Sequence, residues 1–170
     1  MPTAPKPGPA VSDELVVWLR DVLELEHSSA RSLAHLRRLT SDEKLRMRVE
    51  HYELQTRQQI ARLVACLAEH AAAPSFIDGA STRARDAVQW LSDTAQRDTS
   101  ASALRDLVSV AHAKMSTYEI LTRLATMVGD DTTLELARSI VREERAMARF
   151  LDEFWDVAVE ETLRSSGAVR

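Results

Sequence analysis

The chain has 170 residues, of which 45% are apolar and 28% are charged, and its formal net charge is −4. This length and composition suit one soluble globular domain with a sizeable core, and they argue against disorder. Because acidic and basic residues are interleaved, the charge pattern shows no footprint for nucleic acid.

Cys66 is the only cysteine, which excludes an intrachain disulfide and a zinc site built from cysteines. No run approaches the roughly 18 apolar residues of a membrane span. We therefore expect a cytoplasmic protein with no membrane contact. Residues 1–11, rich in proline, are expected to form a flexible leader before a single domain over residues 12–165.

Two helices are predicted in the first half of the chain. Ser12 or Asp13 can cap a helix that runs to about Leu39, because a short polar side chain accepts from free N–H groups of the first turn. Residues 40–43 have the capping-box spacing of Thr and Glu, which predicts a second helix from about residue 42 to 71. The short turn between them predicts antiparallel packing.

Two further long helices are predicted in the second half. Residues 72–80 break the chain, and a short accessory helix is expected at about 82–97. A third long helix is expected over residues 101–128, with Gly129 in a left-handed conformation after its end. The capping-box spacing of Thr132 and Glu135 opens a fourth helix that lasts to about Leu163.

A sequence repeat relates the two halves. Leu19, Arg20 and Asp21 recur as Leu104, Arg105 and Asp106, 85 positions later (104 minus 19). We expect the two segments to lie side by side, related by a half-turn. The fold class predicted is all-α, a ferritin-like antiparallel four-helix bundle made of two helical hairpins with a long crossover that carries the accessory helix.

Acidic residues interrupt the apolar stripes of three helices. Glu26 follows Val22 in the first stripe, Glu53 lies in the second and Glu144 lies in the fourth. In straight antiparallel helices, Glu26 and Glu53 would differ by only about 3 Å along the bundle axis. Buried carboxylates are costly unless they are paired, hydrogen-bonded or bound to a metal.

Di-metal bundles take one Glu from each of two helices and Glu-x-x-His from each of the other two. Here Met147 replaces the His that would follow Glu144, and Ala111 stands where the repeat would place a second copy of Glu26. His112 is a further candidate ligand. The predicted ligands of iron or manganese are therefore Glu26, Glu53, His112 and Glu144. Alternatively, the acids pair with arginines and the histidine packs on a flank.

Several short motifs, in order, make the chain resemble the YciE-type ferritin-like stress proteins of bacteria. The resemblance covers about residues 15–154 and rests on Leu19-Arg20-Asp21 with Glu26, Gln59-Ile60-Ala61-Arg62-Leu63, His112 with Tyr118, Gly129-Asp130-Asp131 and Glu143-Glu144. It implies a ferritin-like bundle, often dimeric, with a di-iron centre and a role in stress response. The chain carries Ala111 and Lys114 where that family tends to carry ligands.

Three functions are compatible with these observations. The first is a ferritin-like homodimer with a degenerate metal site, acting as a structural or regulatory module. The second is an iron or manganese carboxylate protein that handles oxygen or peroxide. The third is a helical domain that binds a protein partner.

Overall fold

The computed structural model describes residues 9–71 and 98–168, which form four long helices and a short C-terminal helix. The leader residues 1–8 and the whole of the expected accessory helix lie outside the described residues. The elements are α1 (Pro9–Leu39), α2 (Glu43–Ala71), α4 (Ser100–Val128), α5 (Asp131–Leu151), the 3-10 helix η1 (Asp152–Phe154) and α6 (Trp155–Ser165).

The helix ends follow local capping chemistry. α1 begins at Pro9, before the expected cap at Ser12 or Asp13; proline is well suited to a first turn. Asp42 accepts from the N–H of Leu45 at 2.7 Å and Asp130 from that of Thr133 at 3.0 Å. The expected capping boxes of α2 and α5 were therefore wrong, because an aspartate three residues before the free N–H group serves instead.

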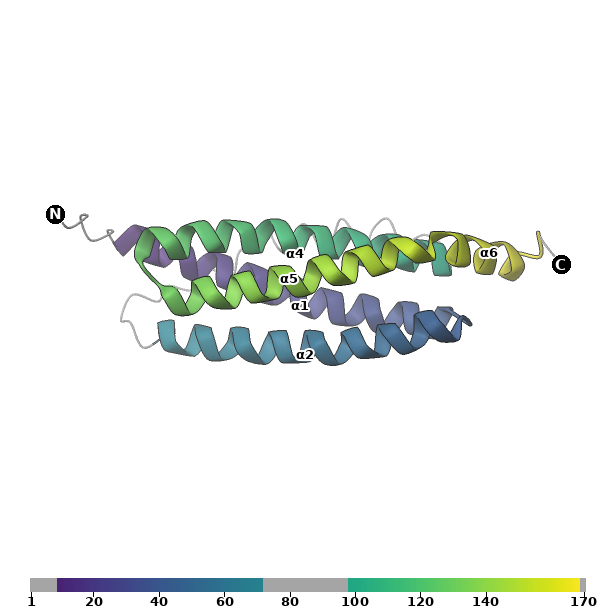
Figure 1. The fold of residues 1–170 in the computed structure, drawn as a ribbon, viewed down its shortest axis with the longest axis horizontal. Coiled ribbons are helices and arrows are strands. Elements are labelled where there is room, and N and C mark those ends of the chain that lie inside the picture. The colour runs from purple at the N-terminus through teal and green to yellow at the C-terminus, as the bar shows by residue number, and fades with distance from the viewer. Residues whose placement is uncertain (1–8, 72–97, 169–170) are drawn as a thin grey trace.

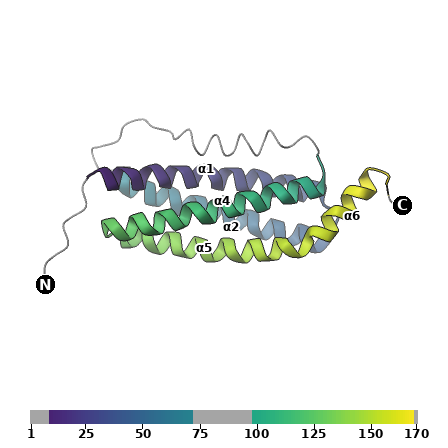
Figure 2. The ribbon, with the colours of Figure 1, turned by 90° about the horizontal axis from the view of Figure 1, so that it is seen from above.

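The C-terminal end of α4 agrees with the prediction, whereas that of α5 does not. Gly129 adopts φ 72° at the end of α4, which confirms the predicted left-handed position. The predicted fourth helix is divided, since η1 separates α5 from α6 and turns the chain (Figure 2).

The four long helices form a bundle of two hairpins, α1 with α2 and α4 with α5 (Figures 1 and 2). α1 and α4 pack antiparallel, because Tyr118 contacts Glu26 and Ser100 contacts Leu39. The two repeated segments do not lie side by side. Leu19 and Leu104 belong to different core clusters, because a half-turn between antiparallel helices exchanges their ends.

The core is divided by a polar layer. One apolar cluster includes Leu36, Leu45 and Leu104, and the other includes Leu63, Leu121 and Ile140. On every long helix, buried polar side chains lie between the residues of one cluster and the residues of the other. They are Glu26, Ser28, Ser29, Thr56, Gln59, Lys114, Thr117 and Glu144.

Glu161 of α6 fastens the C-terminal helix to the turn between α1 and α2. Its Oε1 atom accepts from the N–H groups of Ser41 at 2.6 Å and Asp42 at 2.9 Å. It also accepts from the hydroxyls of Ser41 at 2.7 Å and Thr40 at 3.1 Å. A carboxylate from another helix thus supplies part of the N-terminal cap of α2. Within the described part of the chain, no helix is sufficiently long and apolar to cross a membrane.

Candidate functional site

Three ionisable side chains meet in the middle of the bundle. The Lys114 ammonium of α4 lies 2.7 Å from Glu26 Oε2 of α1 and 2.7 Å from Glu144 Oε1 of α5. Lys114 and Glu26 are fully buried, and Glu144 is 2% exposed. One cation therefore holds two carboxylates from two other helices, and we call this cluster the buried triad.

Hydrogen bonds from two further side chains complete the buried triad. The Tyr118 hydroxyl donates to Glu26 Oε1 at 2.7 Å. The Gln59 amide donates to Glu144 Oε1 at 2.9 Å, while its carbonyl oxygen accepts from Lys114 at 3.4 Å. α2 thus contributes a neutral amide to the centre, where a carboxylate would be a metal ligand.

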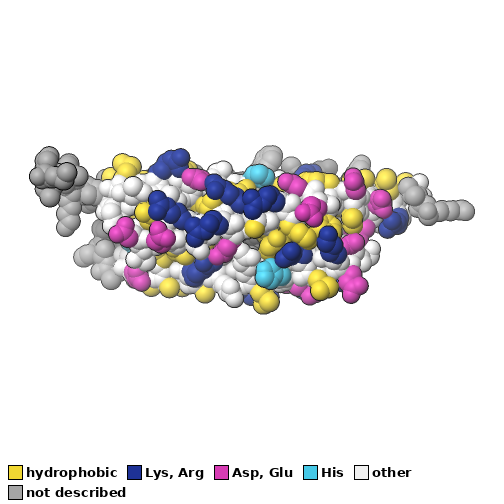
Figure 3. All heavy atoms as spheres, viewed as in Figure 1, with side chains coloured by type: hydrophobic (Ala, Val, Ile, Leu, Met, Phe, Trp, Pro, Cys, Tyr) yellow, Lys and Arg dark blue, Asp and Glu magenta, His cyan; other side chains and the backbone are white. Residues whose placement is uncertain are grey.

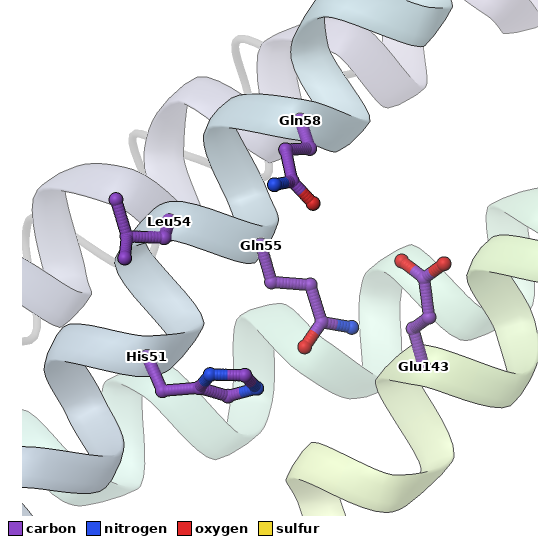
Figure 4. Close-up of a pocket in the computed structure, with 5 residues that line it drawn as sticks. All are labelled: His51, Leu54, Gln55, Gln58 and Glu143. Carbon is purple, nitrogen blue, oxygen red and sulfur yellow. The ribbon is translucent and has the colours of Figure 1, made fainter.

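The same amide connects the buried triad to the surface. Gln59 also donates to Glu143 Oε2 at 2.9 Å, and Arg62 donates to that oxygen at 2.7 Å. Glu143 lines a hollow of about 340 Å³ between α2 and α5, into which His51 and Gln55 point (Figure 4). A chain of polar contacts therefore runs from this hollow to the Lys114 ammonium.

Burial sets the protonation of the buried triad. It raises the pKa of Glu26 from 4.5 to about 7, since the attraction of Lys114 offsets desolvation only in part and Glu144 adds repulsion. Burial alone would lower the pKa of Lys114, but the two carboxylates outweigh it and raise that pKa above its ordinary value. Burial and the Glu26 charge raise the pKa of Tyr118 well above 10. The lysine is therefore charged and the tyrosine remains a hydrogen-bond donor.

A di-metal centre does not fit these residues. A metal ion between Glu26 and Glu144 would occupy the position of the Lys114 ammonium or lie beside it. Like unit charges 4 Å apart repel by roughly 4 kcal/mol at an effective dielectric constant of 20, and by more for a divalent ion. Over residues 9–71 and 98–168, no three His, Cys, Asp or Glu side chains are grouped so that they could hold a metal.

The structure brings together two of the four predicted ligands, Glu26 and Glu144, and separates the other two from them. Glu53 lies on the flank of α2, where it accepts from Arg37 Nε at 2.9 Å. This is the predicted alternative in which an acid pairs with an arginine. His112 is exposed. The buried positions in the middle of α2 are 52, 56, 59, 63 and 66, so Glu53 lies one residue off the buried stripe.

Gln59 was not among the predicted site residues, and Lys114 was noted only as a cation where the family tends to carry ligands, not as the partner of Glu26 and Glu144. An apolar stripe that passes through Ala111 and Met115 would leave Lys114 outside the core, but Lys114 takes the buried position and Met115 is only half-buried. The available signal was the spacing of buried positions 111, 114, 118 and 121, whose alternating steps of three and four continue through the lysine. A lysine at one of these buried positions needs carboxylate partners, because lysine is almost never fully buried unless it is paired.

Comparison with solved structures supports the fold. A protein of Xanthomonas campestris superposes with a TM-score of 0.72 at 19% identity, covering 93% of this chain and 99% of its own. The Escherichia coli stress protein YciF superposes at 0.70 with 21% identity, covering 91% and 98%. A Vibrio cholerae DPS protein, described as a member of the ferritin-like diiron-carboxylate superfamily, superposes at 0.68 with 16% identity, covering 90% and 99%. The predicted ferritin-like bundle is thereby confirmed.

Comparison of sequences identifies the family. No curated protein matches the sequence. One family model, described as a domain of unknown function, DUF892, matches residues 10–164. Together with the structural likeness to YciF, this confirms the resemblance to YciE-type ferritin-like proteins, and the chain belongs to the DUF892 family.

Proposed function

We propose that this protein is a ferritin-like bundle in which a buried ion triad replaces the di-metal centre, and that it acts as a structural or regulatory module. The observation that carries the proposal is the Lys114 ammonium, 2.7 Å from both Glu26 and Glu144. The carboxylates that would bind metal are already neutralised in part by a side chain of the same protein. The likeness to a bacterial stress protein favours a stress-related role.

The competing function, an iron or manganese protein that handles oxygen or peroxide, retains one supporting observation. Glu26 and Glu144 do converge, and the buried Glu144 Oε2 atom has no hydrogen-bond partner. Metal binding would nevertheless require the Lys114 side chain to leave a fully buried position or to lose its proton. Both changes cost free energy, and the raised pKa of Lys114 opposes the second.

Metal content separates the two functions. The protein is purified after growth with added iron or manganese, and its metal is counted per chain. We expect less than about a tenth of an equivalent and no rise of the thermal midpoint on adding metal, because a ligand that binds only the native state must stabilise it. Close to one equivalent or more, lost in Glu26→Ala and kept in the exposed control Glu50→Ala, would overturn the proposal.

A second variant tests whether the lysine is the reason. Lys114→Glu removes the cation and adds a third carboxylate between Glu26 and Glu144, so we expect this variant to bind manganese or iron and to be stabilised by it. Lys114→Ala, which leaves the two native carboxylates and open space, serves if the first variant does not fold. If the variant that folds does not bind metal, Lys114 is not what excludes the metal.

A further inference from the structure

The exposed face of α5 carries a row of four arginines. Arg138, Arg142, Arg145 and Arg149 are all exposed, and they follow one another in steps of four, three and four. Residues at these steps share one face of an α-helix. In Figure 3, Lys and Arg side chains gather across the middle of the molecule, over the helices that Figure 1 labels α4 and α5. We call the four residues the arginine row.

The protein neutralises the arginine row only in part. Two of its members have carboxylate partners at the surface, Glu135 at 3.4 Å and Glu119 at 2.9 Å. Among the residues that the structure describes, the side chains of the other two, Arg142 and Arg149, have no hydrogen-bond or ion-pair partner. Arg142 also has an arginine of the row on each side along the helix, and like charges one turn apart destabilise a helix. An anion placed along the row would relieve this repulsion.

Exposed arginines elsewhere in the protein are neutralised within their own helix. Arg123 of α4 lies 2.9 Å from Glu119, and Arg164 of α6 lies 2.8 Å from Glu160, each four residues from its partner. No Asp or Glu stands three or four residues to either side of Arg142. The pairing that other exposed arginines of this chain have is therefore missing at the centre of the arginine row.

Acidic residues bound the arginine row at both ends. Asp131 and Glu135 precede it on α5, and Asp152 and Glu153 follow it in η1, and all four are exposed. The row is therefore only roughly 16 Å long, since it rises 1.5 Å per residue over 11 residues (149 minus 138). A long polymer of phosphates laid along α5 would extend beyond the row and meet these carboxylates, on a chain whose net charge is −4. The row fits a short anionic segment better than a nucleic acid.

We propose that the arginine row binds an acidic helical segment of a partner protein, whose carboxylates recur on one face in steps of four, three and four. A partner helix has the same rise per residue as α5, so each carboxylate can lie opposite one arginine. A guanidinium group binds a carboxylate through two parallel hydrogen bonds. Ala146 is the only other exposed residue between Arg138 and Arg149, and its small side chain lets a second helix approach closely.

Binding of a synthetic peptide to the full chain tests the proposal. The probe is a fluorescent, alanine-rich helical peptide of about 16 residues whose four glutamates have this spacing. A control peptide has the same composition, with the glutamates distributed around the helix. By fluorescence anisotropy at low salt, we expect the spaced peptide to bind at least about fivefold more tightly than the control peptide. Its binding should weaken as salt is added, because exposed charges are screened.

A double variant tests whether the arginine row is the site. Arg142→Gln with Arg149→Gln removes the two arginines without partners, so the fold should be kept, and we expect the affinity for the spaced peptide to fall by about fivefold or more. Arg31→Gln with Arg164→Gln is the matched control. It changes the net charge equally at two exposed positions, on α1 and α6, outside α5. It should change the affinity by less than about twofold.

Several outcomes would overturn the proposal. They are no binding of the spaced peptide, equal binding of the two peptides, and equal losses in the two double variants. A DNA duplex that binds more tightly than the spaced peptide, and whose binding is lost with Arg142 and Arg149, would make the row a nucleic-acid site instead. Because none of these readouts involves Lys114 or a metal, their failure would leave the buried triad untouched.

Discussion

Replacing Lys114 with methionine removes the ammonium that Glu26 and Glu144 share, while keeping a long unbranched side chain in the core. Both carboxylate residues, Glu26 at 0% and Glu144 at 2% exposed, would remain in the core. Removing one partner of a buried ion pair costs about 3–5 kcal/mol, because the remaining charge is uncompensated. Here each acid keeps one other donor, Tyr118 or Gln59. We therefore expect a loss of about 4 kcal/mol.

Thermal melts followed by circular dichroism measure this loss. In a chain of this size, 1 kcal/mol shifts the thermal midpoint by about 2–4 °C, so the midpoint of Lys114→Met should fall by roughly 8–16 °C. The deficit should be smaller at pH 5.5 than at pH 8, because burial raises the pKa of Glu26 and its protonation removes part of the unpaired charge. Lys44→Met is the matched control, since Lys44 is 72% exposed and 4.0 Å from Glu153. It should change the midpoint by less than about 2 °C.

A triple variant distinguishes lost charge pairing from lost packing. Glu26→Gln, Lys114→Met and Glu144→Gln together leave no charge in the triad and keep acceptors for Tyr118 and Gln59. Replacing all members of a buried ion cluster is often neutral or stabilising. We expect the triple variant to regain at least half of the lost midpoint. A single variant as stable as the wild type, or a triple variant no more stable than the single one, would refute the electrostatic account.

Three further predictions concern Glu26, its hydrogen-bond partner Tyr118, and Glu161 at the start of α2. Glu26 is protonated in both the folded and the unfolded state below pH 4.5, and in the folded state alone up to about pH 7. The stability that this protonation contributes is therefore lost as the pH rises from 4.5 to about 7. Glu26→Gln should flatten this part of a plot of thermal midpoint against pH. Tyr118→Phe should lower the free energy of unfolding by about 1–2 kcal/mol in urea titrations, because it deletes the hydroxyl that donates to Glu26. Glu161→Ala should cost about 2 kcal/mol and speed amide exchange in the first turn of α2, because four hydrogen bonds to Oε1 are lost. Although burial raises the pKa of Glu161, hydrogen bonds from Ser41, Ser100 and Thr40 lower it on balance, so this contribution should be present above pH 4.5 and disappear in acid.

The helices were predictable because their signals are local. Apolar spacing placed the four long helices to within a few residues, and Gly129 marked the end of α4. The division of the last helix at η1 was missed, since no proline or glycine marks it in residues 152–154. Asp42 and Asp130 displaced the expected threonine caps because the sequence offers two polar residues only two positions apart at each helix start, and only geometry decides between them.

The site was harder to predict because a shift of one residue turns a side chain by about 100°. That error placed Glu53 in the core instead of Tyr52 and left the buried Gln59 out of the predicted site. Glu26 and Glu144 were placed correctly because each follows a buried apolar residue, Val22 or Ile140, by a four-residue step. Which carboxylate meets which cation depends on the packing of three helices, and no spacing along one helix encodes it.

The retention of two acids in the core does not by itself indicate a metal site, and the charge balance shows why. With all three groups ionised, Glu26, Glu144 and Lys114 sum to −1, an excess that burial opposes. The raised pKa of Glu26 removes that excess near neutral pH, so the layer approaches neutrality with a lysine and a proton. In a di-metal bundle the cations are metal ions. Here Lys114 supplies one positive charge and a proton on Glu26 supplies the other, so the two acids can be balanced in the core without a metal.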